Sequence, residues 1–574
     1  MKKMICILLT LLMVLSMSVP ALADESHSIT SQEFPTYFDG ADIGVQMSLY
    51  FLDGEKDLPY LEIHDLCDLL NELVGDGGVT VGFDMNIEGS VVTITRHHEG
   101  GIDDGTIVTF DFDKSEIRFM DYNLFTMKRT NSMILDMTGI DYIDDKGEPL
   151  ILQKVDRGTF ARYGDELVLP LADYGIDLVY QPVEDGLYLI PLQTFSDFFL
   201  ASVMNRCAFY NGQYLNLTSE IQSDDEIYYA APTGERSEAL AKFGYSELCM
   251  MLDYMYGLKE VHGIDSFAQL FHQVGFEGLL QSPNALEADA AIYRLITDYL
   301  DDGHSKWHAF SYLSGSLDLE MPLGPSETKW YDQKELYTSV RAKFYPDGIP
   351  GYEEIGNTAY ITFDEFTLSY FDAEQYYQAE DAADLDDSDT IALIMKAHAM
   401  INRENSPIEN VVLDLSCNSG GVANAAAFVL AWFLGEANIG TEDTMTGAVS
   451  ASTYRCDANR DRQFDESDTL AGKRLFCLSS PVSFSCGNLL PCALKASDMV
   501  TILGRTSGGG SCVAQNISSA WGTSFRISGS SRLSFIKNGS YYDIDRGAEP
   551  DFIITSPEKY YDRQNLTDYI NSLY

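Results

Sequence analysis

Residues 408–435 read IENVVLDLSCNSGGVANAAAFVLAWFLG and join a short apolar run, a glycine turn and a long apolar stretch. The run at 410–413 is rich in valine and bounded by polar residues, which is typical of a buried strand. The stretch after the paired glycines is long enough for a buried helix. Strand, turn and helix in this order form the repeating unit of a parallel sheet with crossover helices.

Three more segments have the composition of buried strands, namely 357–366 (NTAYITFDEF), 474–480 (RLFCLSS) and 499–504 (MVTILG). A helical pattern follows at 485–497. Residues 311–574 are therefore predicted to form an α/β core with a mixed, largely parallel sheet and crossover helices. In such sheets functional sites form at the carboxyl ends of strands, so the turns after these strands are the places to search.

Two different patterns precede this core. Residues 233–310 carry apolar side chains at three- and four-residue spacing, which predicts a helical segment. Residues 24–232 consist of short alternating runs such as GTIVTFDFDKSEIRFM, which predict an α+β accessory domain. A strand, Leu-Pro and a short helical pattern occur both at 57–70 and at 166–181, which hints at two subdomains.

The composition excludes several classes of partner. The chain has 574 residues and a formal net charge of −51, which would repel nucleic acid and anionic membrane surfaces. Ten cysteines occur at irregular spacings, and one of them, Cys6, lies in the first apolar run. We expect neither a dense disulfide framework nor a zinc site among the other nine.

The first residues, MKKMICILLTLLMVLSMSVPALADES, contain a lysine pair, an apolar run and Ala21-Leu22-Ala23. This is the pattern of a secretory signal peptide, residues 1–23, cleaved after Ala23. No later stretch is apolar for long enough to span a bilayer. We expect a secreted or extracellular protein, which could also associate with the cell surface.

The turn at 479–490, SSPVSFSCGNLL, presents Ser485 between a strand pattern and a helix pattern. A serine hydroxyl needs a neighbouring base to act as a nucleophile. No histidine follows Ser485 in the chain, which excludes the order of residues used by α/β-hydrolases. A lysine dyad is disfavoured because the turn at 508–510 is Gly-Gly-Gly and Lys495 lies about three helical turns away. An upstream histidine remains, and His304 is better situated than His308 or His398.

Six motifs occur together in the order YLDDGHSKW, GNTAYITFDEF, NVVLDLSCNSGGV, LSSPVSFSCGNLL, ILGRTSGGG and DRGAEPDF. Over residues 237–574 they resemble the C-terminal processing (tail-specific) protease family of serine peptidases. The likeness is closest to its tricorn-core and retinoid-binding-protein-like branch, which uses histidine instead of lysine. No resemblance covers residues 24–232.

The resemblance implies a role for each matching residue. Ser485 matches the nucleophile and His304 the general base. The backbone N–H of Cys486, with that of Gly420 or Gly421, matches the oxyanion hole. The family also has a carboxylate that orients the histidine. Asp545 is the first candidate for this position, and Asp543 is the second. No cofactor is required for this catalysis.

Two features depart from the family pattern. Many members carry a peptide-binding PDZ domain between the histidine segment and the core, but only about fifty residues separate His304 from Asn357. A PDZ domain does not fit there. Cysteines also flank the site at positions 417 and 486, which leaves a cysteine nucleophile as a weaker alternative to Ser485.

An acidic insertion at 456–468, CDANRDRQFDESD, places oxygen-bearing residues at alternate positions of a loop that resembles an EF-hand or dockerin loop. Oxygen ligands at this spacing suit calcium. The insertion equally fits a solvated acidic loop. The candidate ligands of a structural calcium ion are Asp457, Asn459, Asp461, Gln463, Asp465 and Asp468.

The sequence thus predicts an exported serine endopeptidase that acts on peptides or unfolded proteins through an acyl-enzyme. The alternative is a catalytically inactive protein on the same fold that binds peptides or apolar ligands. The presence of Ser485, His304 and the glycine pair together favours the enzyme.

Overall fold

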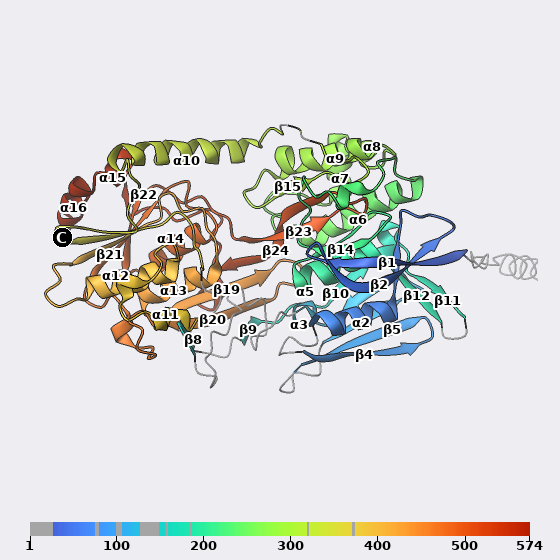
Figure 1. The fold of residues 1–574 in the computed structure, drawn as a ribbon, viewed down its shortest axis with the longest axis horizontal. Coiled ribbons are helices and arrows are strands. Elements are labelled where there is room, and N and C mark those ends of the chain that lie inside the picture. The colour runs from blue at the N-terminus through green and yellow to red at the C-terminus, as the bar shows by residue number, and fades with distance from the viewer. Residues whose placement is uncertain are drawn as a thin grey trace, which may run out of the picture.

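The computed structural model describes residues 27–74, 80–98, 106–126, 149–155, 159–183, 186–317, 319, 321–369 and 373–574. The predicted signal peptide lies outside these residues. Figure 1 shows two halves side by side, with the C-terminal sheet and its helices in one half and the N-terminal sheets in the other. The long helix α10 (Pro325–Phe344) runs along one side of the C-terminal half, and its start lies toward the N-terminal half.

The four middle strands of the C-terminal sheet are those that the sequence pattern marked, and the structure adds an edge strand on each side. The order of the sheet is β16 (Tyr352–Ile355), β17 (Thr358–Thr362), β18 (Asn410–Asp414), β21 (Arg474–Ser479), β22 (Val500–Gly504) and β27 (Phe552–Ile553). From β17 to β27 each neighbouring pair is parallel, and β16 pairs antiparallel with β17. Strands therefore alternate with helices, and the predicted mixed α/β architecture is confirmed.

Successive side chains of a strand point to opposite faces, so this sheet has a core on each side. Ala359 and Val411 pack in one core with the helices α12 (Thr390–Ile401), α13 (Ala423–Leu434) and α14 (Cys486–Ala496). Tyr360 and Val412 pack in the other core with α10, α15 (Glu558–Tyr561) and α16 (Arg563–Asn571). The middle strands are thus buried on both faces, which explains their apolar sequences.

A second sheet joins the two halves. It contains β15 (Lys306–Ala309), β24 (Ser524–Ser534), β19 (Ala437–Asp443), β20 (Val449–Cys456), β8 (Leu152–Lys154), β23 (Cys512–Ser518) and β9 (Thr159–Arg162). Strand β15 follows directly after the histidine turn, and β23 follows the glycine turn at 508–510. This sheet therefore carries the histidine segment to the edge of the C-terminal core.

The N-terminal half contains two sheets and a group of helices. One sheet has the order β11 (Val179–Gln181), β12 (Leu187–Pro191), β3 (Tyr60–Glu62), β2 (Ala41–Leu52), β1 (Ile29–Phe38), β14 (Leu215–Thr218) and β13 (Cys207–Tyr210). The other has the order β10 (Leu167–Pro170), β7 (Glu116–Phe119), β6 (Ile107–Asp111), β5 (Val91–His98) and β4 (Thr80–Glu88). The main helices are α2 (Ile63–Val74), α6 (Glu238–Met255), α7 (Phe267–Val274), α8 (Glu277–Leu280), α9 (Ala285–Arg294) and η4 (Leu295–Leu300).

One hydrophobic core runs through both sheets and these helices. It includes Phe34 of β1, Ile292 of α9 and Phe525 of β24. The core therefore crosses residue 232, where the composition of the sequence changes. The boundary between accessory domain and helical segment stays a prediction from the sequence.

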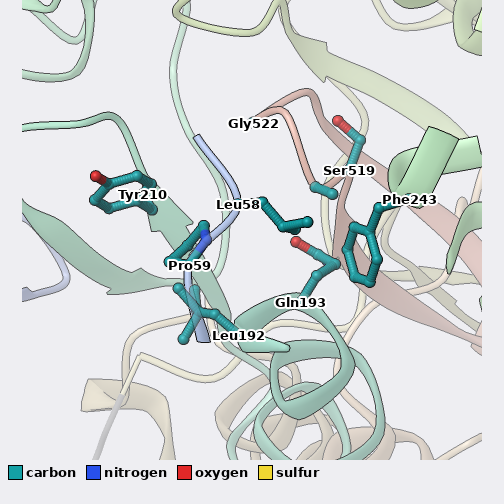
Figure 2. Close-up of a pocket in the computed structure, with 10 residues that line it drawn as sticks. Leu58, Pro59, Leu192, Gln193, Tyr210, Phe243, Ser519 and Gly522 are labelled. Carbon is teal, nitrogen blue, oxygen red and sulfur yellow. The ribbon is translucent and has the colours of Figure 1, made fainter. Parts of the chain in front are cut away.

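The contact of β13, α4 (Leu192–Phe195) and α6 with the β23–β24 turn is closely packed. A cavity of only about 10 Å³ remains there, lined by Leu58, Gln193, Phe243 and Ser519 among others. Figure 2 shows these side chains converging from strands and helices of different parts of the chain. Such a volume holds about one water molecule, so this contact has no room for a ligand.

The buried carboxylate of Asp289 ties α9 to the second sheet. It accepts hydrogen bonds from Trp521 Nε1 at 2.8 Å and Thr523 Oγ1 at 2.5 Å. It also accepts from the hydroxyls of Ser311 at 2.9 Å and Ser314 at 2.6 Å. A carboxylate is stable in such a buried position only because its oxygens are fully hydrogen-bonded.

All nine cysteines of the described ranges are buried free thiols. Within the same ranges, none of the helices combines the length and the apolar character that crossing a membrane would take.

Replacing Asp289 tests this anchor. Asp289→Ala leaves buried N–H and O–H donors without an acceptor, and we expect the free energy of unfolding to fall by about 2–4 kcal/mol. Urea unfolding followed by tryptophan fluorescence measures the change. The matched control is Asp298→Asn, because this nearby carboxylate is 43% exposed and forms its ion pair with Arg294 on the surface of the same helical segment. It should change stability by less than about 0.5 kcal/mol, and equal effects of both variants would contradict the role of Asp289.

Candidate active site

Ser485 lies in the turn between β21 and α14 and has an unusual backbone conformation. Its φ is 55° and its ψ is −124°, a region that residues with a side chain rarely occupy. It is the residue before the first turn of α14, so its side chain lies at the N-terminal end of the helix. A strained serine between a strand and a helix is the geometry of an exposed nucleophile.

Two glycine-containing turns hold this conformation. The Ser485 N–H donates to Gly509 O at 3.0 Å, and the Phe484 N–H donates to Asn418 O at 3.1 Å. The Gly508 N–H returns a bond to the Ser483 carbonyl at 2.7 Å. The turns after β18 and β22 thus fix the turn after β21 by backbone hydrogen bonds. All three turns meet at the carboxyl ends of neighbouring parallel strands.

The glycine turn after β18 contacts Ser485 directly. A Cβ atom on Gly420 would lie 2.7 Å from the Ser485 Cβ, and Gly420 has a φ of +107°. Its N–H donates to the side-chain oxygen of Asn418 at 2.9 Å. In the described part of the chain nothing accepts a hydrogen bond from the N–H of Gly421 or Cys486. Of the three predicted oxyanion-hole donors, Gly421 and Cys486 are therefore the two available to a ligand.

His304 lines the same cavity as Ser485. The cavity has a volume of about 300 Å³. The imidazole rests against the ring of Phe484, with 4.8 Å between the ring centroids. Gly303 permits this contact, because a Cβ atom there would lie 2.4 Å from the Phe484 ring. The residue before the serine is therefore the surface on which the histidine packs.

Burial lowers the pKa of His304 to about 4. The nearby carboxylates of Asp302 and, to a lesser extent, Asp545 oppose this change, whereas Arg526 and Lys306 add to it. The neutral imidazole, which can accept a proton, therefore predominates from mildly acidic pH upward.

The two candidates for the third catalytic residue are bonded to groups other than the histidine. Asp545 accepts hydrogen bonds from the Ser511 N–H at 2.7 Å, the Ser511 hydroxyl at 2.9 Å and Arg532 Nη2. Asp543 accepts from the same Arg532 nitrogen at 2.9 Å. Arg532 thus holds both carboxylates, and the role of either one as partner of His304 stays a prediction.

The remaining wall of the cavity is mostly apolar. It is formed by Val422, Leu489, Val513, Leu533 and Ile544, together with small residues. Cys486 and Cys512 also line it, and burial raises the pKa of the Cys486 thiol to about 12. A thiol with so high a pKa is a poor nucleophile, which favours Ser485 over a cysteine.

The other basic residues considered from the sequence are engaged elsewhere. His308 pairs with Glu220 at 3.1 Å. His398 is buried in α12 and accepts a hydrogen bond from Trp432 Nε1 at 3.1 Å. Lys495 contacts Asp551 at 3.5 Å and donates to the Glu549 carbonyl. Of these candidate bases, His304 is the one that shares the cavity with Ser485.

The acidic loop adopts a turn-rich conformation without converging carboxylates. Asp457 accepts from the N–H groups of Asp461 and Arg462, and Asp468 accepts from those of Asn459 and Asp465. Arg462 has a φ of 61° where an EF-hand has its glycine. The described residues contain no group of three or more His, Cys, Asp or Glu side chains arranged to hold a metal. Calcium binding stays a prediction from the spacing.

Three polar residues of the site were not among the sequence candidates. These are Asp302, which binds the histidine turn, Asn418, which binds the glycine turn, and Arg532, which binds Asp545. Asp302 could have been recognised from the sequence, because an aspartate in a turn often accepts a hydrogen bond from the backbone N–H two residues later. Asn418 had the same kind of local signal, because it accepts from the N–H of Gly420 two residues later. Arg532 binds a carboxylate thirteen residues away in another element and leaves no local signal.

A family comparison agrees with this geometry. Residues 357–554 match the model of peptidase family S41. This match, over about a third of the chain, confirms the predicted resemblance to the C-terminal processing proteases, which are serine peptidases. The assignment to the tricorn-core branch stays a prediction. No curated protein matches the chain.

Three similar solved structures illustrate the range of likeness. A putative peptidase from Parabacteroides merdae is 14% identical, with a TM-score of 0.41, over 59% of this chain and 96% of that one. Mature CPAF is 11% identical, with a TM-score of 0.36, over 58% and 96%. The photosystem II D1 C-terminal processing protease is 19% identical, with a TM-score of 0.26, over 35% and 43%. At these TM-scores the likenesses carry no argument about this chain.

Gly420→Ala tests the contact between the glycine turn and the serine. The added methyl group would displace Ser485 or the turn, so the rate at which a fluorophosphonate probe labels Ser485 should fall about 100-fold or more. The matched control is Gly212→Ala, at a φ of +81° with nothing within 4 Å. It carries a similar backbone strain in open space and should label at the normal rate. Equal labelling of both variants would show that the contact is unimportant.

Proposed function

We propose that this protein is an exported serine endopeptidase that hydrolyses peptide bonds through an acyl-enzyme on Ser485. The observation that carries the proposal is the strained backbone of Ser485 in a cavity shared with His304 and with two residues whose N–H groups are available to a ligand. Strain of this kind persists only where the surrounding structure enforces it, and it clusters at functional sites. The match of residues 357–554 to the model of peptidase family S41 supports the same reaction.

In the proposed mechanism His304 removes the proton from the Ser485 hydroxyl as the oxygen attacks the carbonyl carbon of the substrate. The N–H groups of Cys486 and Gly421 stabilise the resulting oxyanion. The protonated imidazole then gives its proton to the leaving amine, and the C–N bond breaks. Water, activated by the same histidine, hydrolyses the acyl-enzyme and restores the serine.

The substrate is proposed to be a peptide or an unfolded protein with an apolar residue on the acyl side of the cleaved bond. The cavity next to Ser485 supports this preference, because its described lining includes no acidic or basic side chain other than His304. A volume of about 300 Å³ suits a single aliphatic side chain. The helix α10 occupies the sequence interval in which related proteases carry a PDZ domain, so we do not propose capture of a substrate through its C-terminus.

The proposal includes export through the signal peptide at residues 1–23 and a structural calcium ion in the acidic loop. Neither has a part in the chemistry. The non-catalytic binding protein is the competing function, and active-site labelling separates the two.

Active-site labelling tests the assignment of nucleophile and base. A fluorophosphonate probe should label the wild-type protein at Ser485, and Ser485→Ala should abolish both labelling and cleavage of a peptide with leucine on the acyl side. His304→Gln should slow both by about 10²–10⁴-fold. His308→Gln is the matched control, because this histidine lies in the same segment but pairs with Glu220. Absence of labelling in the folded wild-type protein would favour the binding protein instead.

The low pKa of His304 predicts an unusual dependence on pH. The base must be neutral to accept the serine proton, so kcat/KM should fall only as the pH drops through about 4, the pKa of the buried imidazole. A free histidine would give this fall near pH ~6.5. Initial rates from about pH 3.5 to 8, with the fold monitored by circular dichroism, measure the position of the fall. A midpoint above about pH 6 in the folded protein would contradict the burial of the base.

A further inference from the structure

The carboxylate of Asp302 is the centre of a hydrogen-bond network around the histidine turn. One oxygen accepts from the His304 N–H at 3.0 Å, the Ser305 N–H at 2.7 Å and the Ser528 hydroxyl at 2.7 Å. The other accepts from the Ser305 hydroxyl at 2.7 Å and the Tyr256 hydroxyl at 2.9 Å. These donors come from the turn itself, from the C-terminal end of α6 and from β24.

The network fixes the peptide groups on both sides of His304. Its N–H is held by Asp302, and its carbonyl oxygen accepts a hydrogen bond from Arg526 Nε at 2.9 Å. The hydroxyl of Ser305 accepts from the Ser528 N–H at 3.1 Å, which ties the next residue to β24 as well. With its backbone held at both ends and its ring against Phe484, the imidazole has one favoured direction.

Asp545, the carboxylate suggested by the family pattern, is differently engaged. Its oxygens already accept from Ser511 and Arg532, and the positive charge of Arg532 lies against it. Because the charge of Arg532 offsets that of Asp545, this carboxylate attracts a second cation, such as the imidazolium of His304, only weakly. The donors to Asp302 within the described residues are instead two backbone N–H groups and three hydroxyls, which leave its negative charge in place.

We propose that Asp302 is the positioning residue of His304, which orients the base through its backbone and stabilises the imidazolium that forms during acyl transfer. This inference rests on the proposed peptidase function. The effect of Asp302 passes through the histidine turn and not through contact with the reacting atoms. Asp545 is then chiefly a partner of Arg532 and of the Ser511 turn.

The electrostatic part of this role follows from the groups that face His304. These are Asp302, Arg526, Asp545 and Lys306, and Asp302 is the stronger of the two carboxylates in favouring the protonated form. Removing its charge should lower the pKa of His304 further and weaken the proton acceptor. The acid fall of kcat/KM should therefore move to lower pH, while kcat decreases at neutral pH.

The experiment compares Asp302→Asn with Asp301→Asn. The amide introduced by Asp302→Asn would keep an acceptor oxygen but lose the charge, and we expect kcat to fall about 10- to 100-fold with KM changed less than about threefold. The ratio of kcat/KM at about pH 4 to that at about pH 7 should rise. Asp301 is the neighbouring carboxylate, whose oxygens accept from the Ser326 N–H at the start of α10. Its left-handed backbone, with a φ of 37°, tolerates asparagine, so this control should match the wild type in rate and pH ratio.

The outcomes separate the two levels of the proposal. A wild-type protein that is folded but not labelled at Ser485 overturns the peptidase and this inference together. A labelled wild-type protein with Asp302→Asn equal to Asp301→Asn overturns only the inference. The inference is likewise overturned if Asp545→Asn moves the acid fall and Asp302→Asn does not.

Two further variants test the same role of Asp302 if the Asp302→Asn protein does not fold. Tyr256→Phe and Ser528→Ala each remove one donor to Asp302 and leave its charge in place. Combined, they should lower kcat about 3- to 10-fold without moving the acid fall, because the carboxylate is loosened but still charged. An unchanged kcat in the folded double variant overturns the positioning role.

Discussion

The backbone of Ser485 is the constraint on which the rest of the site depends. A residue with a side chain at φ 55° and ψ −124° is unfavourable by about 1–3 kcal/mol in isolation. Here the hydrogen bonds to Gly509 O and Asn418 O enforce it. Those two acceptors belong to turns at the ends of neighbouring parallel strands, so the strand order of the sheet determines the direction of one hydroxyl group. Glycine is needed at positions 420, 509 and 510, because a Cβ atom there would collide with Ser485, Asp545 and Phe484, respectively.

The histidine reaches this serine by a separate route. It stands at the entry to β15, whose partner β24 runs from the N-terminal core to the C-terminal sheet. The helix α10 adds a second connection between the two segments. Near its start the Ser326 N–H binds Asp301 beside the histidine turn, and Trp330 Nε1 donates to Val482 O in the serine turn at 3.3 Å. Figure 1 shows this helix along the C-terminal half, with its start toward the N-terminal half. Serine and histidine are thus connected through a sheet on one side and a helix on the other.

The sequence was sufficient for those features that depend on local pattern. The buried strands at 410–413 and 474–479 and the glycine turns at 420–421 and 508–510 are visible as apolar runs and clustered glycines. Chain order left only upstream histidines as bases, and His304 was chosen among them from its place after a predicted helix and from the family resemblance. Arg532 could not be found in this way, because its partner Asp545 is recognised only once the turns are assembled. The continuous N-terminal core was hidden for the same reason, since packing across residue 232 leaves no local trace.

The residues of the site come from distant parts of the chain, so the site can form only late in folding. Ser485 has its strained backbone only when three turns from distant parts of the chain have docked, and His304 faces it only when β15 has paired with β24. An unfolded or half-folded chain contains the same serine and histidine but neither the shared cavity nor the oriented N–H groups. In the proposed peptidase, completion of the fold is therefore the step that brings nucleophile and base together, and the unfinished chain lacks the site.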